Sequence, residues 1–280
     1  MHPFVLFLLI LAAVLAVLCT LYVLAVRPGP RRAETKRFAH GTYAHRGLHN
    51  AERPENSMAA FRAAVEAGYD IELDVQLSRD GVPMVFHDAS LSRMCAVDGR
   101  LSDYTAEELA RMPLAGHAEH TIPTFAEVLD MVDGRVMLLV EIKGEKDIAP
   151  VCEGAAALLD AYDGPFCVES FSPYVVKWMR DNRPAWVRGQ LSSRFLRDPR
   201  HRNLNGLIMQ LLLPNFLTKP DFIAYDCRYS RYFSLVIATR LFRAYALGWT
   251  VKSNGQEHAC RNRFDGIIFE GYLPKKRNDK

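Results

Sequence analysis

The sequence predicts an α/β fold, a TIM (β/α)8 barrel preceded by a single transmembrane helix. From Thr42 onward, short apolar or β-branched runs alternate with stretches of helical periodicity, the pattern of parallel strands joined by crossover helices. Eight such runs are present, the number that closes this barrel. The third observation is an uncharged apolar run at the start of the chain, residues 4–26.

The predicted strands are, in chain order, Tyr43 to His45, Ile71 to Asp74, Val136 to Lys143, Phe166 to Phe171, Val187 to Leu191, Phe222 to Asp226, Tyr245 to Val251 and Gly266 to Glu270. The predicted helices between them are Asn56 to Ala67, Phe125 to Val132, Ala149 to Ala161, Ser172 to Asn182 and Tyr232 to Arg243. No linker-like stretch divides residues 38–280. We therefore expect one barrel domain, residues 42–274, followed by a polar tail, residues 275–280.

The transmembrane helix is predicted from residues 4–26, in which Thr20 is the one clear polar interruption. A bilayer core of about 30 Å needs roughly 20 apolar residues in a helix. A cleaved signal peptide and a buried core helix are the alternatives. A signal peptide begins with basic residues, whereas residues 1–3 here are Met-His-Pro, so we expect a retained anchor after this short tail.

A basic linker, residues 27–41, orients the anchor. A Pro-Gly-Pro sequence at residues 28–30 ends any helix there. The linker contains Arg27, Arg31, Arg32, Lys36 and Arg37. Because positive charge collects on the cytoplasmic side, we expect a single-pass protein of the cell membrane whose domain lies in the cytoplasm.

The domain itself is nearly neutral, because residues 38–280 hold 30 Lys and Arg against 31 Asp and Glu. No basic field indicates a nucleic acid partner. The six cysteines show no CxxC spacing, which argues against a zinc site or a disulfide framework and suits a reducing compartment.

One segment departs from simple alternation of strand and helix. Residues 71–77 and 82–88 are strand-like and flank an Asp80-Gly81 turn, which predicts a hairpin. With the turn centred near Arg79-Asp80, His87 falls opposite Glu72. In the same register Met84 or Val85 falls opposite Asp74.

Glu72 and Asp74 are the sharpest local signal, because the side-chain period of two places both carboxylates on one face of an apolar strand. Buried together they would repel unless a cation joined them. Oxygen-only ligation indicates Mg²⁺ or Ca²⁺. The alternative is a solvent-facing strand edge, which alternates in the same way.

Glu141 is the second acid candidate, since it stands at the end of the apolar run that begins at Leu138. Barrel enzymes place their working residues at this end of the strands. The alternative is a Glu141–Lys143 pair that helps the strand leave the core. His45 and His87 also stand at strand ends near these acids, which sets them apart from the other seven histidines.

Several motifs occur in a fixed order: Ala44-His45-Arg46-Gly47, Pro54-Glu55-Asn56-Ser57, Ile71-Glu72-Leu73-Asp74-Val75, Val85-Phe86-His87-Asp88 and Glu141-Ile142-Lys143. Supporting motifs include Ile122-Pro123-Thr124-Phe125, Glu169-Ser170-Phe171, Gly248-Trp249-Thr250-Val251 and Phe264-Asp265-Gly266. In this order and spacing the chain resembles the glycerophosphodiester phosphodiesterase family over nearly all of residues 42–270.

The resemblance implies a TIM barrel and a set of site residues. The metal ligands would be Glu72, Asp74 and Glu141; the acid/base pair His45 and His87; the phosphate-binding residues Arg46 and Lys143; and the supporting residues Glu55, Asn56 and Trp249. The implied cofactor is a divalent cation, Mg²⁺ or Ca²⁺. The implied partner is a small glycerophosphodiester, cut to glycerol 3-phosphate and an alcohol through a cyclic phosphate formed by the glycerol 2-hydroxyl.

Two departures from the family pattern concern the substrate rim. The family usually has Thr-Val-Asn after the tryptophan and Ile-Thr-Asp late in the last strand, where this chain has Val251-Lys252 and Phe269-Glu270. The segment from Ser193 to Pro220 carries no motif. It either packs as a helix outside the barrel, caps the mouth, or lies against the membrane beside the anchor.

Two other functions compete with the hydrolase. A phospholipase-like enzyme of the same fold would act on intact membrane lipids, for which the anchor is suited. A catalytically silent membrane scaffold would use the barrel for binding, but such a barrel has no physical need for five costly polar groups at strand ends.

Overall fold

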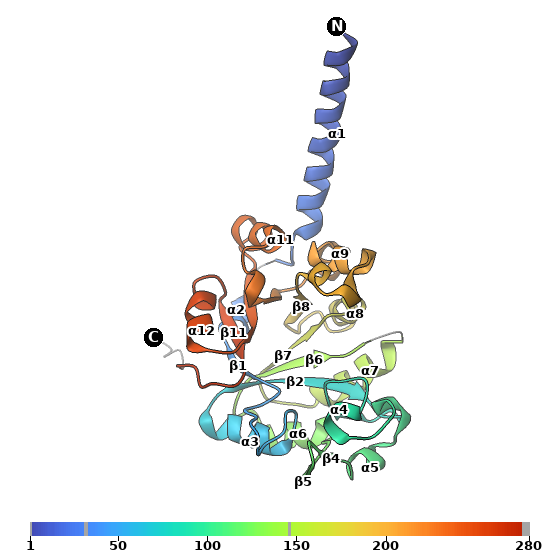
Figure 1. The fold of residues 1–280 in the computed structure, drawn as a ribbon, viewed down its shortest axis with the longest axis vertical. Coiled ribbons are helices and arrows are strands. Elements are labelled where there is room, and N and C mark those ends of the chain that lie inside the picture. Colours follow the sequence, from blue (N-terminus) through green and yellow to red (C-terminus); the bar gives the residue numbers. More distant parts are fainter. Residues whose placement is uncertain (1, 31–32, 145–146, 276–280) are drawn as a thin grey trace.

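The computed structural model describes residues 2–30, 33–144 and 147–275 and shows a closed barrel (Figure 1). Its eight parallel strands are β1 (Thr42–His45), β2 (Asp70–Leu77), β6 (Leu138–Ile142), β7 (Phe166–Ser170), β8 (Arg188–Ser192), β9 (Phe222–Asp226), β10 (Tyr245–Val251) and β11 (Gly266–Phe269). Each pairs with the next, and β11 pairs with β1. The predicted TIM barrel and all eight predicted strands are confirmed.

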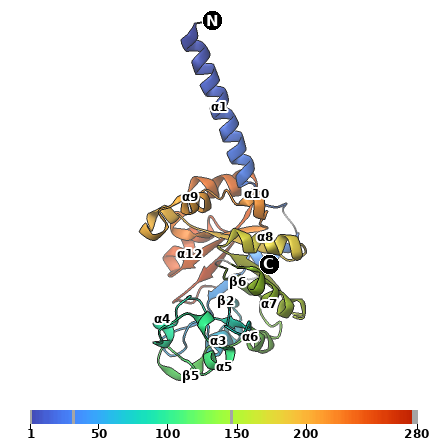
Figure 2. The same ribbon diagram turned by 90° about the vertical axis from the view of Figure 1, so that its right-hand side faces the viewer.

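Helices cover the outside of the barrel (Figures 1 and 2). They are α3 (Met58–Ala67), α6 (Phe125–Val132), α7 (Ala149–Asp160), α8 (Pro173–Asn182), α9 (Leu204–Gln210), α10 (Asn215–Thr218), α11 (Phe233–Val236) and α12 (Asn254–Arg261). The helix expected over residues 232–243 is α11 continued by a wider π-helical turn, η5 (Ile237–Leu241). Short 3₁₀ turns are η2 (Phe195–Arg197), η3 (Pro199–His201) and η4 (Cys227–Tyr229).

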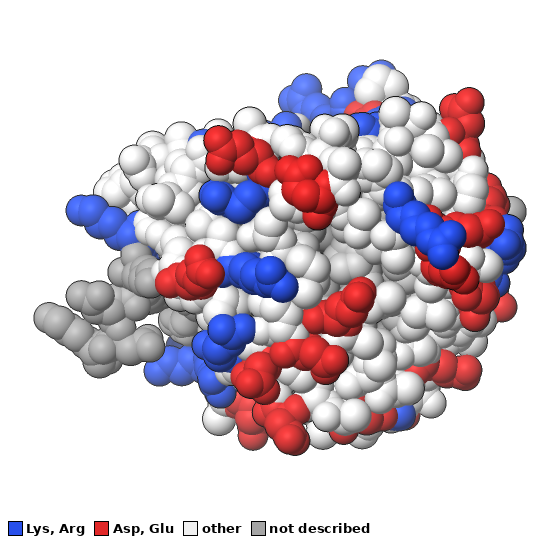
Figure 3. Space-filling model, turned by 90° about the horizontal axis from the view of Figure 1, so that it is seen from below, with Lys and Arg blue, Asp and Glu red and all other residues white. Residues whose placement is uncertain are grey.

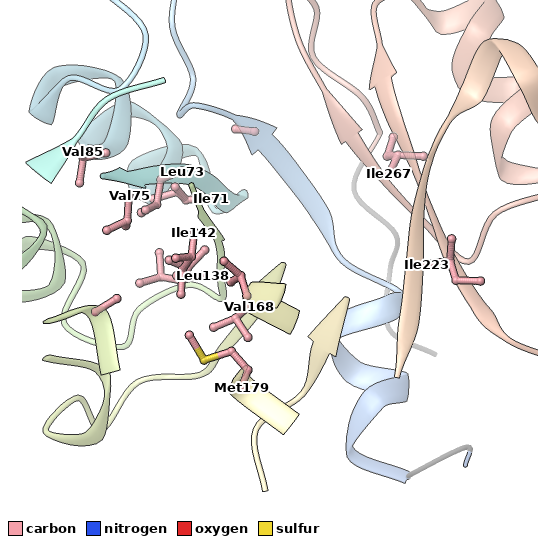
Figure 4. Packing of buried hydrophobic residues seen from close by; sticks show 14 of the residues in the cluster. Ile71, Leu73, Val75, Val85, Leu138, Ile142, Val168, Met179, Ile223 and Ile267 are labelled. Carbon is pink, nitrogen blue, oxygen red and sulfur yellow. The ribbon is translucent and has the colours of Figure 1, made fainter. Parts of the chain in front are cut away.

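Alternate residues of each strand face opposite layers of the core. Side chains such as Ile71, Leu73 and Leu138 pack outward against the helices, and Figure 4 shows this layer with Met179 of α8 within it. Residues such as Leu139 belong to a second, inner cluster. Glu141, two positions after Leu139, lies on the same inward face, so its carboxylate lies at the mouth of the barrel.

An insertion between β2 and β6 builds a small lobe with a core of its own. It contains β3 (Pro83–Val85), α4 (Ser92–Cys95), η1 (Leu101–Asp103), α5 (Ala106–Leu109), β4 (Pro113–Leu114) and β5 (His117–Thr121). β3 pairs antiparallel with β2, as the predicted hairpin requires.

The register expected for this hairpin is wrong by one residue. Val75 pairs with Val85, and the Phe86 amide bonds to the Asp74 carbonyl, so Asp74 faces Phe86. The prediction assumed a two-residue loop at Arg79-Asp80. The structure has a three-residue loop that ends on Gly81 at φ +80°, the left-handed position such loops need.

The apolar helix α1 (Pro3–Val26) projects away from the barrel as one rod (Figures 1 and 2). It is long and apolar enough to cross a membrane, and none of its apolar window is buried. Its end is different, because Val26 is fully buried in the core. The basic linker contains α2 (Ala33–Ala39), a helix that the sequence analysis did not predict.

Candidate active site

Strand register brings the predicted acids together at the carboxyl ends of neighbouring strands. His45 of β1 lies beside Glu72 of β2. Asp74 of β2 lies beside Glu141 of β6. One oxygen from each of Glu72, Asp74 and Glu141 lies within 4.8 Å of the others. The period of two along β2 places both of its acids on one face, as the spacing predicted, and the register with β6 brings Glu141 to them.

Burial excludes the alternative of a solvent-facing edge. Glu72 is 2 % exposed, Asp74 0 % and Glu141 6 %. Their apolar neighbours Ile71 and Leu73 are buried on the other face of β2. The strand is thus covered on both sides, as in other parallel barrels.

Glu169 of β7 is a fourth acid at this position, which the sequence analysis named in a supporting motif without predicting a role for it. It pairs in register with Glu141 and is 2 % exposed. Its Oε2 atom is buried without a hydrogen-bond donor among the described residues. Counting two residues on from Cys167, as for Leu139 and Glu141, would have found it.

Two cations lie among these acids. The Lys143 Nζ is 2.7 Å from Asp74 Oδ1 and 2.6 Å from Glu141 Oε1. The Arg46 Nε is 3.5 Å from Asp74 Oδ2, and its backbone amide donates to Glu72 Oε2 at 2.9 Å. Glu141 and Lys143 therefore do form an ion pair, as the alternative interpretation supposed. The pair lies inside the barrel mouth, however, and does not lead the strand out to solvent.

The electrostatics divide the acids into two kinds. Burial and the neighbouring carboxylates raise the pKa of Glu72 and of Glu169 well above the ordinary value. Burial also raises the pKa of Glu141, to about 7, although Lys143 opposes the shift. Burial alone would raise the pKa of Asp74 too, but Lys143 and Arg46 outweigh it and hold that pKa low. The charged forms of Glu72, Glu141 and Glu169 are thus disfavoured where they lie.

Both predicted histidines are held by a carboxylate at the same ring atom. His45 Nδ1 lies 2.8 Å from Glu270 Oε2. His87 Nδ1 lies 2.7 Å from Asp88 Oδ1. When Nδ1 donates to the carboxylate, Nε2 carries the lone pair and is available to a substrate. Burial lowers the pKa of both imidazoles, which favours the neutral ring.

An ion-pair network ties the loops of the mouth together. Arg93 donates to Asp88 at 2.5 Å and to Glu55 at 2.6 Å. Glu55 also accepts from Arg46 at 2.6 Å. Asn56 completes the set by donating to Asp74 Oδ2 at 2.8 Å. The structure therefore brings Glu55 and Asn56 to the site.

A cavity of about 400 Å³ opens beside these groups, lined by His87, Glu141 and Lys143 and by Phe171 of the loop after β7. Trp249 of β10 packs edge-on against Phe171, with ring centroids 5.5 Å apart. Trp249 thus contacts one wall of the cavity and does not reach the acids through any hydrogen bond of the described residues.

Comparison with known proteins places this geometry in a family. A sequence model of the glycerophosphoryl diester phosphodiesterase family matches residues 45–269. A glycerophosphodiester phosphodiesterase of Bacillus altitudinis is 41 % identical over 116 residues, which are 38 % of this chain and 45 % of that protein. One from Caldanaerobacter subterraneus is 33 % identical over 58 % of this chain and 70 % of that protein.

Solved structures agree in fold. An Oleispira antarctica phosphodiesterase, solved with the product sn-glycerol-3-phosphate, has a TM-score of 0.68 at 22 % identity and covers 83 % of this chain and 94 % of that one. A glycerophosphodiester phosphodiesterase from Thermotoga maritima has a TM-score of 0.61 at 24 % identity, covering 82 % of this chain and 94 % of that one. With its barrel and with the match over residues 45–269, the chain belongs to the glycerophosphoryl diester phosphodiesterase family.

Proposed function

We propose that this protein is a metal-dependent phosphodiesterase that cuts glycerophosphodiesters into glycerol 3-phosphate and an alcohol. The observation that carries the proposal is the group of three buried carboxylates within 4.8 Å, beside two histidines with carboxylate-bound Nδ1 atoms. The names of the matched relatives and the product bound in the Oleispira antarctica structure support the same reaction.

Glu72, Asp74 and Glu141 are the residues that we propose as ligands of a divalent cation. Their oxygens fit one, because burial and the neighbouring carboxylates raise the pKa values of Glu72 and Glu141, and a bound cation would favour their charged forms. Glu169, which pairs in register with Glu141, adds an Oε2 atom that accepts no hydrogen bond among the described residues. Oxygen donors of this kind favour Mg²⁺ or Ca²⁺. When bound, the cation would neutralise the phosphodiester oxygens and the charge that develops on them.

His45 and His87 are the proposed acid and base. One imidazole takes the proton of the glycerol 2-hydroxyl as its oxygen bonds to phosphorus, and the other gives a proton to the alcohol oxygen that leaves. The cyclic phosphate is then opened by water, with the two imidazoles in exchanged roles. Glu270 and Asp88 hold the rings in place and stabilise each imidazolium as it forms.

Arg46 and Lys143 are the proposed phosphate-binding residues. The Lys143 ammonium has three N–H donors and lies 2.7 Å from Asp74 Oδ1 and 2.6 Å from Glu141 Oε1. Lys143 also lines the adjoining cavity, where a phosphate oxygen would be a further acceptor. Arg46 is fixed by Glu55, so its guanidinium needs little reordering when substrate binds.

We further propose that α1 is a retained single-pass anchor, with the catalytic domain in the cytoplasm. Its last residue, Val26, is buried in the core, and Asn215 Nδ2 donates to the Val26 carbonyl at 2.9 Å. A cleaved leader would not need such contacts. A reporter fused after Lys280 tests the topology, and activity of that reporter outside the cell would overturn the cytoplasmic assignment.

The activity is tested by release of glycerol 3-phosphate from glycerophosphocholine and glycerophosphoethanolamine by the full chain in nanodiscs. Turnover should require Mg²⁺ or Ca²⁺, stop with EDTA, and be lost in Glu72→Gln and His45→Ala. Glu107→Gln is the matched control, since Glu107 is 77 % exposed on α5. If the folded chain binds the cation but releases nothing, intact membrane lipids become the leading substrates. Inactivity on those lipids as well would favour the scaffold.

A further inference from the structure

Exposed apolar side chains gather around the foot of α1. Of the eight large apolar side chains exposed in the described residues outside α1, six come from α9, α10, α11 and η5. We call these six the collar: Leu204, Leu207, Phe216, Phe233, Val236 and Leu241. Leu204 is 70 % exposed, Phe216 59 % and Leu241 61 %. A folded domain rarely leaves such a patch without a partner.

The collar is joined to the last turns of α1. The Tyr22 ring lies 5.9 Å from the Phe233 ring, and Tyr22 Oη donates to the Leu211 carbonyl at 3.3 Å. Figures 1 and 2 show α9 to α11 beside the lower end of α1, with the rest of the barrel further away. The segment from Ser193 to Pro220 therefore packs against the foot of α1 and does not only cover the outside of the barrel.

The position of the Tyr22–Phe233 contact along α1 determines how close the collar would lie to a membrane. A bilayer core of about 30 Å takes roughly 20 helical residues. Counted from Phe4, that span ends near Val23. Tyr22 stands at this level, where tyrosine is favoured at membrane interfaces. If α1 spans a bilayer in this way, Phe233 of the collar, which contacts Tyr22, lies at the boundary between the acyl chains and the headgroups.

Positive charge lies beside the collar. Residues 193–244 hold nine Lys and Arg against three Asp, whereas the whole domain is nearly neutral. A cavity of about 390 Å³ next to Val236 is lined by four arginines, Arg240, Arg243, Arg261 and Arg263, and by one acid, Asp265. Within the described residues, no ion pair engages Arg240, Arg243 or Arg263. The end opposite α1 differs, since acidic side chains stand among the basic ones there (Figure 3).

We propose that the collar and this arginine pocket form one bilayer-contact surface, in which the collar enters the boundary layer and the pocket holds anionic phospholipid headgroups. The proposal rests on α1 being the membrane anchor proposed above. A second copy of the chain is a poorer occupant, because two such surfaces would bring like charges together. Amphipathic contact combined with basic residues is typical of surfaces that rest on anionic membranes.

Together with the anchor, the bilayer-contact surface would fix the orientation of the active site relative to the membrane. The Ser192 hydroxyl at the end of β8 donates to the Met209 carbonyl of α9 at 2.8 Å. Phe195 of η2 contacts Phe171 of the cavity wall, with ring centroids 6.0 Å apart. One side of the barrel mouth is therefore continuous with the collar and would lie beside the membrane.

Lipid quenching of a fluorophore tests the collar. The full chain, with Cys19 and Cys227 replaced by serine, receives a single label at Phe216→Cys or Leu241→Cys, or at the controls Leu9→Cys in α1 and Glu107→Cys in α5. In nanodiscs with acyl-brominated phosphatidylcholine, quenching at Phe216→Cys and Leu241→Cys should be several-fold larger than at Glu107→Cys. Quenching at Leu9→Cys reports the anchor separately.

The outcomes separate the two proposals. If Leu9→Cys is quenched while Phe216→Cys and Leu241→Cys resemble Glu107→Cys, the collar proposal is wrong and the anchor stands. If Leu9→Cys is not quenched, the anchor itself is wrong. If the labels at Phe216→Cys and Leu241→Cys escape quenching, and are protected from solvent only in discs that hold two copies of the chain, the surface is an interface between copies and the collar proposal is wrong.

The pocket is tested by lipid charge. Adding phosphatidylglycerol to the discs should increase quenching of the label at Phe216→Cys. The increase should be several-fold smaller when the pocket arginines are replaced together, by Arg240→Gln, Arg243→Gln and Arg263→Gln. A matched variant loses three distant charges, through Arg62→Gln, Arg79→Gln and Arg111→Gln, and should keep the full increase. An equal increase in both variants would overturn the assignment of the pocket to anionic headgroups.

Discussion

The carboxylate of Glu270 holds His45 across the seam at which the barrel closes. His45 ends β1, Glu270 follows β11, and the Nδ1 and Oε2 atoms are 2.8 Å apart. The bond with His45 holds the pKa of Glu270 well below its ordinary value. Lys252 lies 3.1 Å from the other oxygen of Glu270. Glu270, a residue that departs from the family pattern at this rim, thus holds a predicted catalytic histidine in place.

Glu270→Gln should lower kcat by about 10- to 100-fold, part of the 10²–10⁴ that positioned acid–base catalysis contributes. The amide cannot stabilise an imidazolium, so the pKa of His45 should fall further. The limb of the pH–rate profile that reports His45 should therefore move to lower pH, whether it is the acid or the alkaline limb. An unchanged profile would contradict this role.

Lys252→Met is the matched control for Glu270→Gln. It removes a partner of Glu270 that is 60 % exposed and leaves the His45–Glu270 bond intact. We expect kcat within about threefold of the parent, because exposed ion pairs contribute little. A loss as large as that of Glu270→Gln would mean that Lys252 itself contacts substrate.

Glu72→Gln should separate stability from activity. Glu72 is buried beside Asp74 and Glu141, and its pKa is raised because its charged form is disfavoured there. Without a cation, the amide should leave the free energy of unfolding unchanged or raise it by about 1 kcal/mol, since a buried like-charge contact is relieved. Activity should fall more than about 100-fold.

The measurement is thermal unfolding with EDTA and with Mg²⁺ or Ca²⁺. The parent Tm should rise when the cation is added, by the linkage between binding and folding. In Glu72→Gln the rise should be much smaller. A Glu72→Gln protein that loses several kcal/mol with EDTA would show that the carboxylate stabilises the fold without a metal.

The strand pattern was enough to predict the barrel, because eight apolar runs with helices between them have one common solution. The period of two was also enough to place Glu72 and Asp74 on one face of a strand, whereas grouping them with Glu141 as metal ligands came from the resemblance to the family. The α12 helix was missed although Ser253 caps it by accepting from the Gln256 amide, a local signal visible in the sequence.

Other features depend on tertiary contacts that no local pattern contains. Whether Glu72 faces solvent depends on what covers β2, and only the closed barrel decides that. The bond between His45 and Glu270 joins residues 225 positions apart. The packing of the collar on α1 similarly depends on where Asn215 meets Val26. These relationships follow from barrel closure and from the docking of α1.

Gly47→Ala should destabilise the loop that carries Arg46. Gly47 has φ +82°, and an added Cβ would lie 2.9 Å from the carbonyl carbon of Ala60 and from the Phe61 ring. Gly81→Ala is the matched control, with φ +80° and open space around the new Cβ. Both changes should cost about 1–2 kcal/mol for the left-handed backbone.

Gly47→Ala should cost a further 1–3 kcal/mol, approximately, because a backbone carbon cannot move aside. Urea unfolding of both variants measures the difference. Equal losses would show that the loop after β1 yields to the added methyl group.

Asn215→Ala tests whether the end of α1 is part of the domain. The Asn215 side chain is fully buried, and its Nδ2 donates to the Val26 carbonyl at 2.9 Å. Alanine would leave that carbonyl without this donor, so the free energy of unfolding of the full chain should fall by about 1–3 kcal/mol. In residues 38–280 alone the same substitution should cost much less, because its partner is absent. A double-mutant comparison by denaturant unfolding measures the coupling, and equal losses in both chains would mean that α1 is only tethered to the barrel.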